Sequence, residues 1–219
     1  MKNKKIRFVC FIFVLLFVFS VFAGGLKMVL STQQANAEYA YTSAKSMCVM
    51  EAGSKRVLYN KNENQELAMA STTKIMTAIT AIENCADLDK VFEISPKAVG
   101  ISGTSLYLRK GEKFCLRDLL YGLMLISGND ASVAIGEYVG GSTKNFVQMM
   151  NDMAKKIGAN NTHFDNTHGL DSDNHYTTAY DLALITSYAM QNDTFKEIVS
   201  TQNKKIVNSD GKTRYLKNK

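Results

Sequence analysis

The sequence has few cysteines, and no two of them are close together. Cys10, Cys48, Cys85 and Cys115 are too far apart for a C-x-x-C pattern, which excludes the common cysteine motifs of metal and redox centres. In an exported chain the last three could supply one disulfide. We favour the other interpretation, in which they are small buried apolar side chains, because this is a frequent role of cysteine.

The 219-residue chain also lacks acidic residues before Glu38, whereas five of its 26 basic residues lie in 1–37. The net charge of +6 therefore originates at the start of the chain, because 21 basic and 20 acidic residues remain beyond residue 37. This balance leaves no basic surface for nucleic acid, and no nucleic-acid partner is expected. The share of apolar residues, 46%, is typical of a globular domain.

Residues 1–37 have the pattern of an export signal. A basic start, Met1 to Arg7, precedes an uncharged run from 8 to 26, and Ala35-Asn36-Ala37 forms a small-x-small cleavage site. The uncharged run is also long enough to cross a bilayer. We therefore expect 1–37 to be a signal peptide or an N-terminal anchor that supplies any membrane contact, and 38–219 to be an exported domain.

Short strands are expected near both ends of the exported part, with helices between them and no internal repeat. The predicted strands, which are apolar runs bounded by turn residues, are 44–50, 57–59, 205–207 and 213–216. The predicted helices, from apolar periodicity and capping residues, are 71–82, 116–126, 131–139, 145–157 and 178–190. This order predicts an α/β fold, in which an antiparallel sheet is built from both chain ends and a helical lobe is inserted.

Ser71 and Lys74 form the first candidate site, in the run Ser71-Thr72-Thr73-Lys74. Residues three apart share a helix face, so the amine of Lys74 can accept the proton of the Ser71 hydroxyl if burial lowers its pKa. A helix N-terminus at Ser71 would favour the developing negative charge. Alone the pattern is weak, since S-x-x-K is expected about once by chance in such a chain, as a cap followed by a solvated lysine.

Ser127-Gly128-Asn129 is the second candidate and lies where the predicted helix 116–126 ends. Ser127 could relay a proton between Lys74 and a leaving amine, and Asn129 could donate to a substrate amide. The alternative is a C-capping glycine with polar neighbours.

In this order the two motifs resemble the penicillin-binding and serine β-lactamase family, which is defined by S-x-x-K, then S-D-N or S-G-N, then K-T-G. Within it the chain is most similar to the D-alanyl-D-alanine carboxypeptidases, and the similarity extends over about 43–219. The runs that carry it, besides the motifs, are 107–112, 118–124, 164–170 and 175–179. The family more often has proline where Thr167 stands.

The resemblance implies a β-lactamase/transpeptidase-like fold and a serine-type carboxypeptidase at the cell wall or the outer face of the membrane, with a role in cell shape. Ser71 would attack the bond between the two terminal D-alanines of a peptidoglycan stem peptide, with Lys74 as general base and Ser127 and Asn129 completing the site. β-Lactams would acylate the same serine. No cofactor or metal is implied.

The family's third motif, K-T-G, is absent. Lys212-Thr213-Arg214 is a weak substitute, because its surroundings resemble the segment that precedes this motif and Arg214 lacks the flatness of glycine. The resemblance therefore implies a chain that stops before one strand, with a sheet incomplete at the C-terminus and an exposed edge. Loss of one oxyanion donor would cost about 10²–10³ in rate.

Three alternatives stay open. The first is a metal site in a stretch whose spacings match no standard motif, formed by His163, Asp165, His168, Asp171, Asp173 and His175. The second is a β-lactamase, although no E-x-x-L-N context follows Asn129. The third is a truncated, non-catalytic protein that binds wall peptide.

Overall fold

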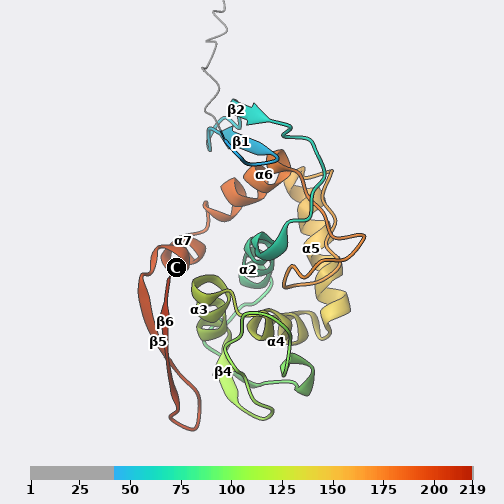
Figure 1. The fold of residues 1–219 in the computed structure, drawn as a ribbon. Coiled ribbons are helices and arrows are strands. Elements are labelled where there is room, and N and C mark those ends of the chain that lie inside the picture. The colour runs from blue at the N-terminus through green and yellow to red at the C-terminus, as the bar shows by residue number, and fades with distance from the viewer. Residues whose placement is uncertain (1–41, 219) are drawn as a thin grey trace, which may run out of the picture. The chain divides into compact units, whose positions relative to one another are not determined.

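The computed structural model describes residues 42–218 (Figure 1). The signal peptide or anchor predicted for 1–37 lies outside this range. Within it, no helix combines the length and the apolar character that crossing a bilayer requires.

Helix α2 (Thr73–Glu83) is the centre of the described fold, and the other helices surround it (Figure 1). Its buried residues cover most of its circumference, as expected of a helix enclosed by others. It contacts α3, α4, α5, α6 and α7. Their bounds are Leu116–Ile126, Asn129–Gly140, Thr143–Ile157, Ala179–Ala189 and Asp193–Ser200.

Capping residues begin and end the helices much as the sequence predicts. Ser142 accepts a hydrogen bond from the backbone N–H of Asn145 at the start of α5, and Gly158, with φ 92°, ends that helix. The predicted bounds of α3 are confirmed, and the other predicted helices agree to within two residues. Helix α7 was not predicted, because its eight residues carry only two buried apolar anchors, Phe195 and Ile198.

The strands form three separate two-stranded antiparallel sheets. Their bounds are β1 Met47–Met50 with β2 Val57–Lys61, β3 Val91–Glu93 with β4 Lys113–Cys115, and β5 Asn203–Val207 with β6 Thr213–Lys217. The predicted hairpins at both ends are confirmed, but the prediction of one sheet from both ends is wrong for the described residues. The first hairpin packs through β1 on α6 and the last packs on α3, so no strand of one reaches the other.

The three described cysteines, Cys48, Cys85 and Cys115, are free thiols of intermediate burial. Burial raises the pKa of the Cys48 and Cys115 thiols. The disulfide alternative is therefore wrong for residues 42–218.

Arg214 joins the last hairpin to the segment that precedes α3. Its Nη2 lies 2.8 Å from Oε2 of Glu112, a carboxylate that is only 5% exposed. Its Nε and Nη2 also donate to the main-chain oxygens of Leu106 and Tyr107, at 3.0 and 3.1 Å. Nε and Nη2 of the guanidinium are thus engaged in holding the fold, whereas Nη1 is buried without a hydrogen-bond partner among the described residues. This agrees with the expectation that Lys212-Thr213-Arg214 does not replace K-T-G.

Replacing Arg214 by methionine should lower the free energy of unfolding by about 3 kcal/mol, because the buried Glu112 carboxylate would lose its charged partner. Urea unfolding would measure the change. Arg56→Met is a matched control on an exposed arginine, expected to stay within about 0.5 kcal/mol of wild type. Equal effects of the two changes would contradict this account of Arg214.

Candidate active site

Ser71 lies in a short 3-10 helix, η1 (Ala70–Thr72), that leads directly into α2. Its hydroxyl oxygen is 3.1 Å from Nζ of Lys74, as the spacing of three residues predicts. Ser71 is exposed, whereas Lys74 is only 2% exposed. The pair therefore combines an accessible hydroxyl with a buried amine.

The amine of Lys74 has no carboxylate partner among the described residues. It donates to the main-chain oxygen of His168 at 2.7 Å. Burial lowers the pKa of Lys74 to about 8. A useful fraction of the amine is then neutral near pH 7–8 and can accept a proton, so the alternative of a solvated lysine is wrong.

Ser127 ends α3 in the left-handed conformation, with φ 61° and ψ 39°. The alternative of Gly128 as the left-handed cap is wrong, because Gly128 has φ −63°. A residue with a Cβ is strained at such a position, and strain of this kind clusters at functional sites. The Ser127 hydroxyl is buried and has no hydrogen-bond partner in the described part of the chain.

Asn129 begins α4 and is fastened to a loop at 102–104. Its Nδ2 donates to the main-chain oxygen of Ser102 at 2.6 Å, and its backbone N–H donates to that of Thr104 at 2.7 Å. A Cβ added at Gly103 would stand 2.6 Å from Nδ2, so the loop requires glycine there. One hydrogen of the amide group is thus occupied and one remains.

Asp130 was not singled out from the sequence, yet it orders the neighbouring loop. Its carboxylate accepts hydrogen bonds from the Ser105 hydroxyl at 2.7 Å and from the backbone N–H groups of Leu106 and Leu108 at 2.9 Å. Its position directly after Asn129 is the only sign of this role in the sequence.

The segment 164–177 contacts the start of α2 and the turn before it, through the main-chain oxygen of His168, the ring of His175 and the backbone of Gly169. Gly169 lies so near the turn that carries Ser71 that an added Cβ would stand 1.9 Å from the main-chain oxygen of Ala70. Burial, and then the charge of Lys74, lower the pKa of His168 to about 4. The sequence did not predict that the segment 164–177 contacts Thr73 and Lys74, because these residues are about 100 positions apart in the chain.

The metal alternative finds no geometric support in this segment. Both ring nitrogens of His175 are hydrogen-bonded, and Nδ1 of His168 accepts from the backbone N–H of Leu170 at 3.1 Å. Among residues 42–218, no group of three or more histidines, cysteines and acidic residues is placed to hold an ion.

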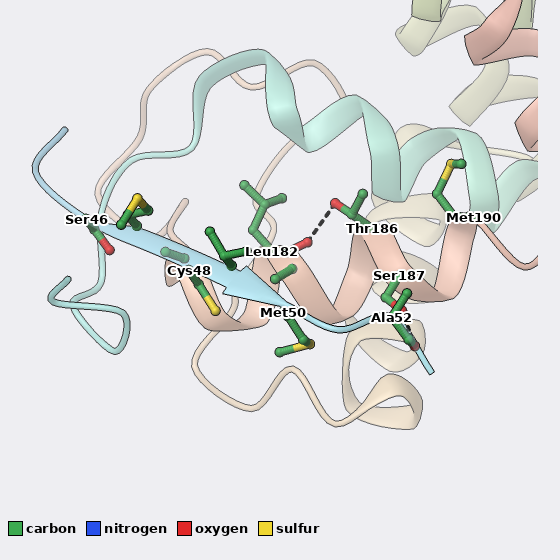
Figure 2. Close-up of a pocket in the computed structure, with 12 residues that line it drawn as sticks. Ser46, Cys48, Met50, Ala52, Leu182, Thr186, Ser187 and Met190 are labelled. Atoms are coloured by element: carbon green, nitrogen blue, oxygen red, sulfur yellow. Dashed lines mark hydrogen bonds between the residues drawn. The ribbon is translucent and has the colours of Figure 1, made fainter. Parts of the chain in front are cut away.

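An apolar pocket lies elsewhere, between β1 and α6, with a volume of about 700 Å³. Figure 2 shows Met50 and Cys48 on one side of it and Leu182 and Met190 on the other. It contains none of the four candidate residues. The structure therefore places Ser71 and Lys74 in direct contact, with Ser127 and Asn129 at the junction of α3 and α4, two helices that pack on α2.

Comparisons with known proteins identify relatives of this chain. A curated relative from Bacillus subtilis, the D-alanyl-D-alanine carboxypeptidase DacF, is 38% identical over 163 residues, which cover 72% of this chain and 42% of the relative. A solved D-alanyl-D-alanine carboxypeptidase DacD from Francisella tularensis has a TM-score of 0.71 at 36% identity, covering 75% of this chain and 41% of that one. A mutant of a Streptomyces DD-transpeptidase has a TM-score of 0.77 at 32% identity, with 81% and 75% covered.

These similarities confirm the β-lactamase/transpeptidase-like α/β fold. The chain spans about two-fifths of the length of the first curated relatives, 42% and 39%. The family model for peptidase S11, described as D-alanyl-D-alanine carboxypeptidase, matches residues 31–219. The chain therefore belongs to the D-alanyl-D-alanine carboxypeptidase family of serine peptidases.

Proposed function

We propose that this protein is a penicillin-sensitive, serine-type D-Ala-D-Ala carboxypeptidase that trims peptidoglycan stem peptides outside the cytoplasm. The observation that carries the proposal is the exposed Ser71 hydroxyl, 3.1 Å from a buried lysine amine whose pKa is about 8. Family membership supports the substrate class. The export signal expected in residues 1–37, a signal peptide or an anchor that contacts the membrane, supports a site of action outside the cytoplasm.

Acylation begins with the neutral Lys74 amine. It accepts the proton of the Ser71 hydroxyl while one of its own hydrogens stays on the main-chain oxygen of His168. The oxygen of Ser71 attacks the carbonyl carbon of the penultimate D-alanine, and the bond to the terminal residue breaks. The proton passes to the leaving amine, free D-alanine departs, and water later cleaves the ester with Lys74 again as base.

Ser127 and Asn129 complete the proposed site. The unpartnered hydroxyl of Ser127 suits a relay that passes the proton from Lys74 to the leaving amine. Asn129 has one amide hydrogen held by Ser102, and the other would donate to a substrate carbonyl. No cofactor takes part in this mechanism.

A non-catalytic protein that binds wall peptide is the second candidate. A binder and an enzyme differ in one measurable respect. Only the enzyme forms a covalent ester on Ser71.

Incubation of the 219-residue chain with benzylpenicillin should give a single stable mass adduct, because a β-lactam acylates the serine that attacks the D-Ala-D-Ala bond. Intact-mass spectrometry measures it, and release of D-alanine from a D-Ala-D-Ala peptide tests the natural reaction.

The matched control is Ser71→Ala, which should bind no penicillin covalently and release no D-alanine. A folded wild-type chain without an adduct would favour the non-catalytic binder. Rapid turnover of penicillin in place of a long-lived adduct would indicate a β-lactamase.

The rate of acylation should rise with pH up to about 8 and then level off, since only the neutral form of Lys74 can accept the proton. Below that pKa the rate should fall about tenfold per pH unit. Stopped-flow measurement of adduct formation between pH 6 and 9 would test this, with Ser71→Ala to subtract background hydrolysis. A profile that is flat across this range would point to a base with a much lower pKa, such as a histidine, and would contradict the role of Lys74.

A further inference from the structure

His175 is a buried histidine behind the nucleophile turn that the proposed mechanism does not use. It is 2% exposed and lies edge-on to the ring of Phe164, with the ring centroids 5.9 Å apart. Its Nδ1 is 3.0 Å from the backbone nitrogen of Asp165, and its Nε2 is 2.7 Å from Oγ1 of Thr73. The ring thus connects the segment 164–177 to the first residue of α2.

The hydrogen bonds around His175 define one tautomer. The backbone N–H of Asp165 can only donate, so Nδ1 must accept. The Thr73 hydroxyl gives its single hydrogen to the main-chain oxygen of Ala70 at 2.7 Å, so it must accept from Nε2–H. A neutral ring with its hydrogen on Nε2 satisfies both requirements. An imidazolium would direct a hydrogen from Nδ1 against the N–H of Asp165.

The Ala70 carbonyl at the end of this chain of hydrogen bonds is part of a strained turn. Ala70 has φ 46°, which is unusual for a residue with a Cβ, and it directly precedes Ser71. Its carbonyl accepts hydrogen bonds from the hydroxyl and the backbone N–H of Thr73, and Gly169 lies so close to it that no Cβ would fit between them. Strained backbone of this kind persists only where its surroundings over-determine it.

We propose that His175 is a positioning residue for acylation: through the Thr73 hydroxyl it fixes the Ala70 peptide and so keeps the Ser71 oxygen aligned with Lys74. The inference rests on the proposed function, since it concerns the same serine. It adds a residue that touches neither substrate nor nucleophile. The segment 164–177 would then have two roles in the site. The main-chain oxygen of His168 accepts a hydrogen bond from the Lys74 amine, and His175 positions the turn before Ser71.

The neutral state of His175 depends on all the groups that face it. Burial is the largest effect and lowers the pKa of His175 below its usual value. The carboxylates of Asp165 and Asp171 act in the opposite direction and favour the cation. The charge of His163 opposes the cation, as burial does. Helix α2 presents the uncharged Thr73 hydroxyl to the ring, and His168, whose own pKa is lowered to about 4, is neutral near pH 7. The ring therefore remains a donor at Nε2 over the pH range in which Lys74 works.

Two variants separate the hydrogen-bond donor of His175, its Nε2–H group, from the acceptor, Nδ1. In His175→Gln the amide nitrogen can occupy the place of Nε2 and still donate to Thr73. In His175→Asn the shorter amide reaches only the place of Nδ1, so the bond to Thr73 is lost. We expect the maximal acylation rate by benzylpenicillin to fall on the order of tenfold to a hundredfold in the asparagine variant, with the concentration for half-maximal rate unchanged. The glutamine variant should stay close to wild type.

Thr73→Val removes the hydroxyl and keeps its shape, and it serves as the second arm. If loss of the hydrogen bond between His175 and Thr73 is what slows acylation, the double variant Thr73→Val/His175→Asn will acylate no more slowly than the slower of the two single variants. Equal losses in the asparagine and glutamine variants, additive losses in the double variant, or losses that follow only the melting temperature would overturn the inference.

Two controls distinguish failure of this inference from failure of the proposed function. Wild-type protein without an adduct refutes the proposed function. Wild-type protein with an adduct, matched by an equal rate in His175→Asn, refutes the inference alone. Nitrogen-15 shifts of His175 are independent of activity, and they should show a neutral ring with hydrogen on Nε2 at pH 7. A doubly protonated ring would overturn the proposal.

Discussion

The burial of one lysine amine without a counter-ion is the constraint on which the site depends. Moving the pKa of Lys74 from 10.5 to about 8 corresponds to roughly 3 kcal/mol against the charged form in the folded state. This cost is fully present below pH 8, where the folded protein must hold a charged lysine, and it disappears as the pH rises toward 10.5. The central position of α2, in contact with all five other described helices, supplies the packing that offsets it. The same burial that destabilises the fold makes the amine a base.

Strained backbone occurs at both motifs. Ala70, directly before Ser71, and Ser127, at the end of α3, both have positive φ although neither is glycine. Each such residue costs on the order of 1–3 kcal/mol and persists only where neighbours fix it. At Ala70 the neighbours are Thr73 and Gly169, and at Ser127 they are the ends of two packed helices. The packing of α2, α3 and α4 therefore stabilises a geometry that neither motif would adopt alone.

Local sequence rules predicted most of the helices and the contact between Ser71 and Lys74, because both follow from residues a few positions apart. Ser142 and Gly158 bound α5 for reasons visible in the sequence. The rules failed where distant segments decide the outcome. They left open a C-capping Gly128 as the alternative to a functional motif, whereas the residue in the left-handed conformation is Ser127. They also gave no sign that the carbonyl of His168 would receive the Lys74 amine. The prediction of a single sheet was wrong for a related reason. In each terminal hairpin the two strands pair only with each other, and the two hairpins pack on different helices.

All four candidate residues lie on helical elements or at their junctions, and none lies on a hairpin, yet the last hairpin still acts on the site. Arg214 of β6 holds the carbonyls of Leu106 and Tyr107, and the carboxylate of Asp130 holds the N–H of Leu106 from the other side. Asp130 follows Asn129 directly, so the loop is fixed between the hairpin and the second motif. A change in β6 can therefore reach Asn129 through two sets of hydrogen bonds to the backbone without touching Ser71. The turn that carries Ser71 is held separately, by contacts of the segment 164–177 with Thr73 and Lys74.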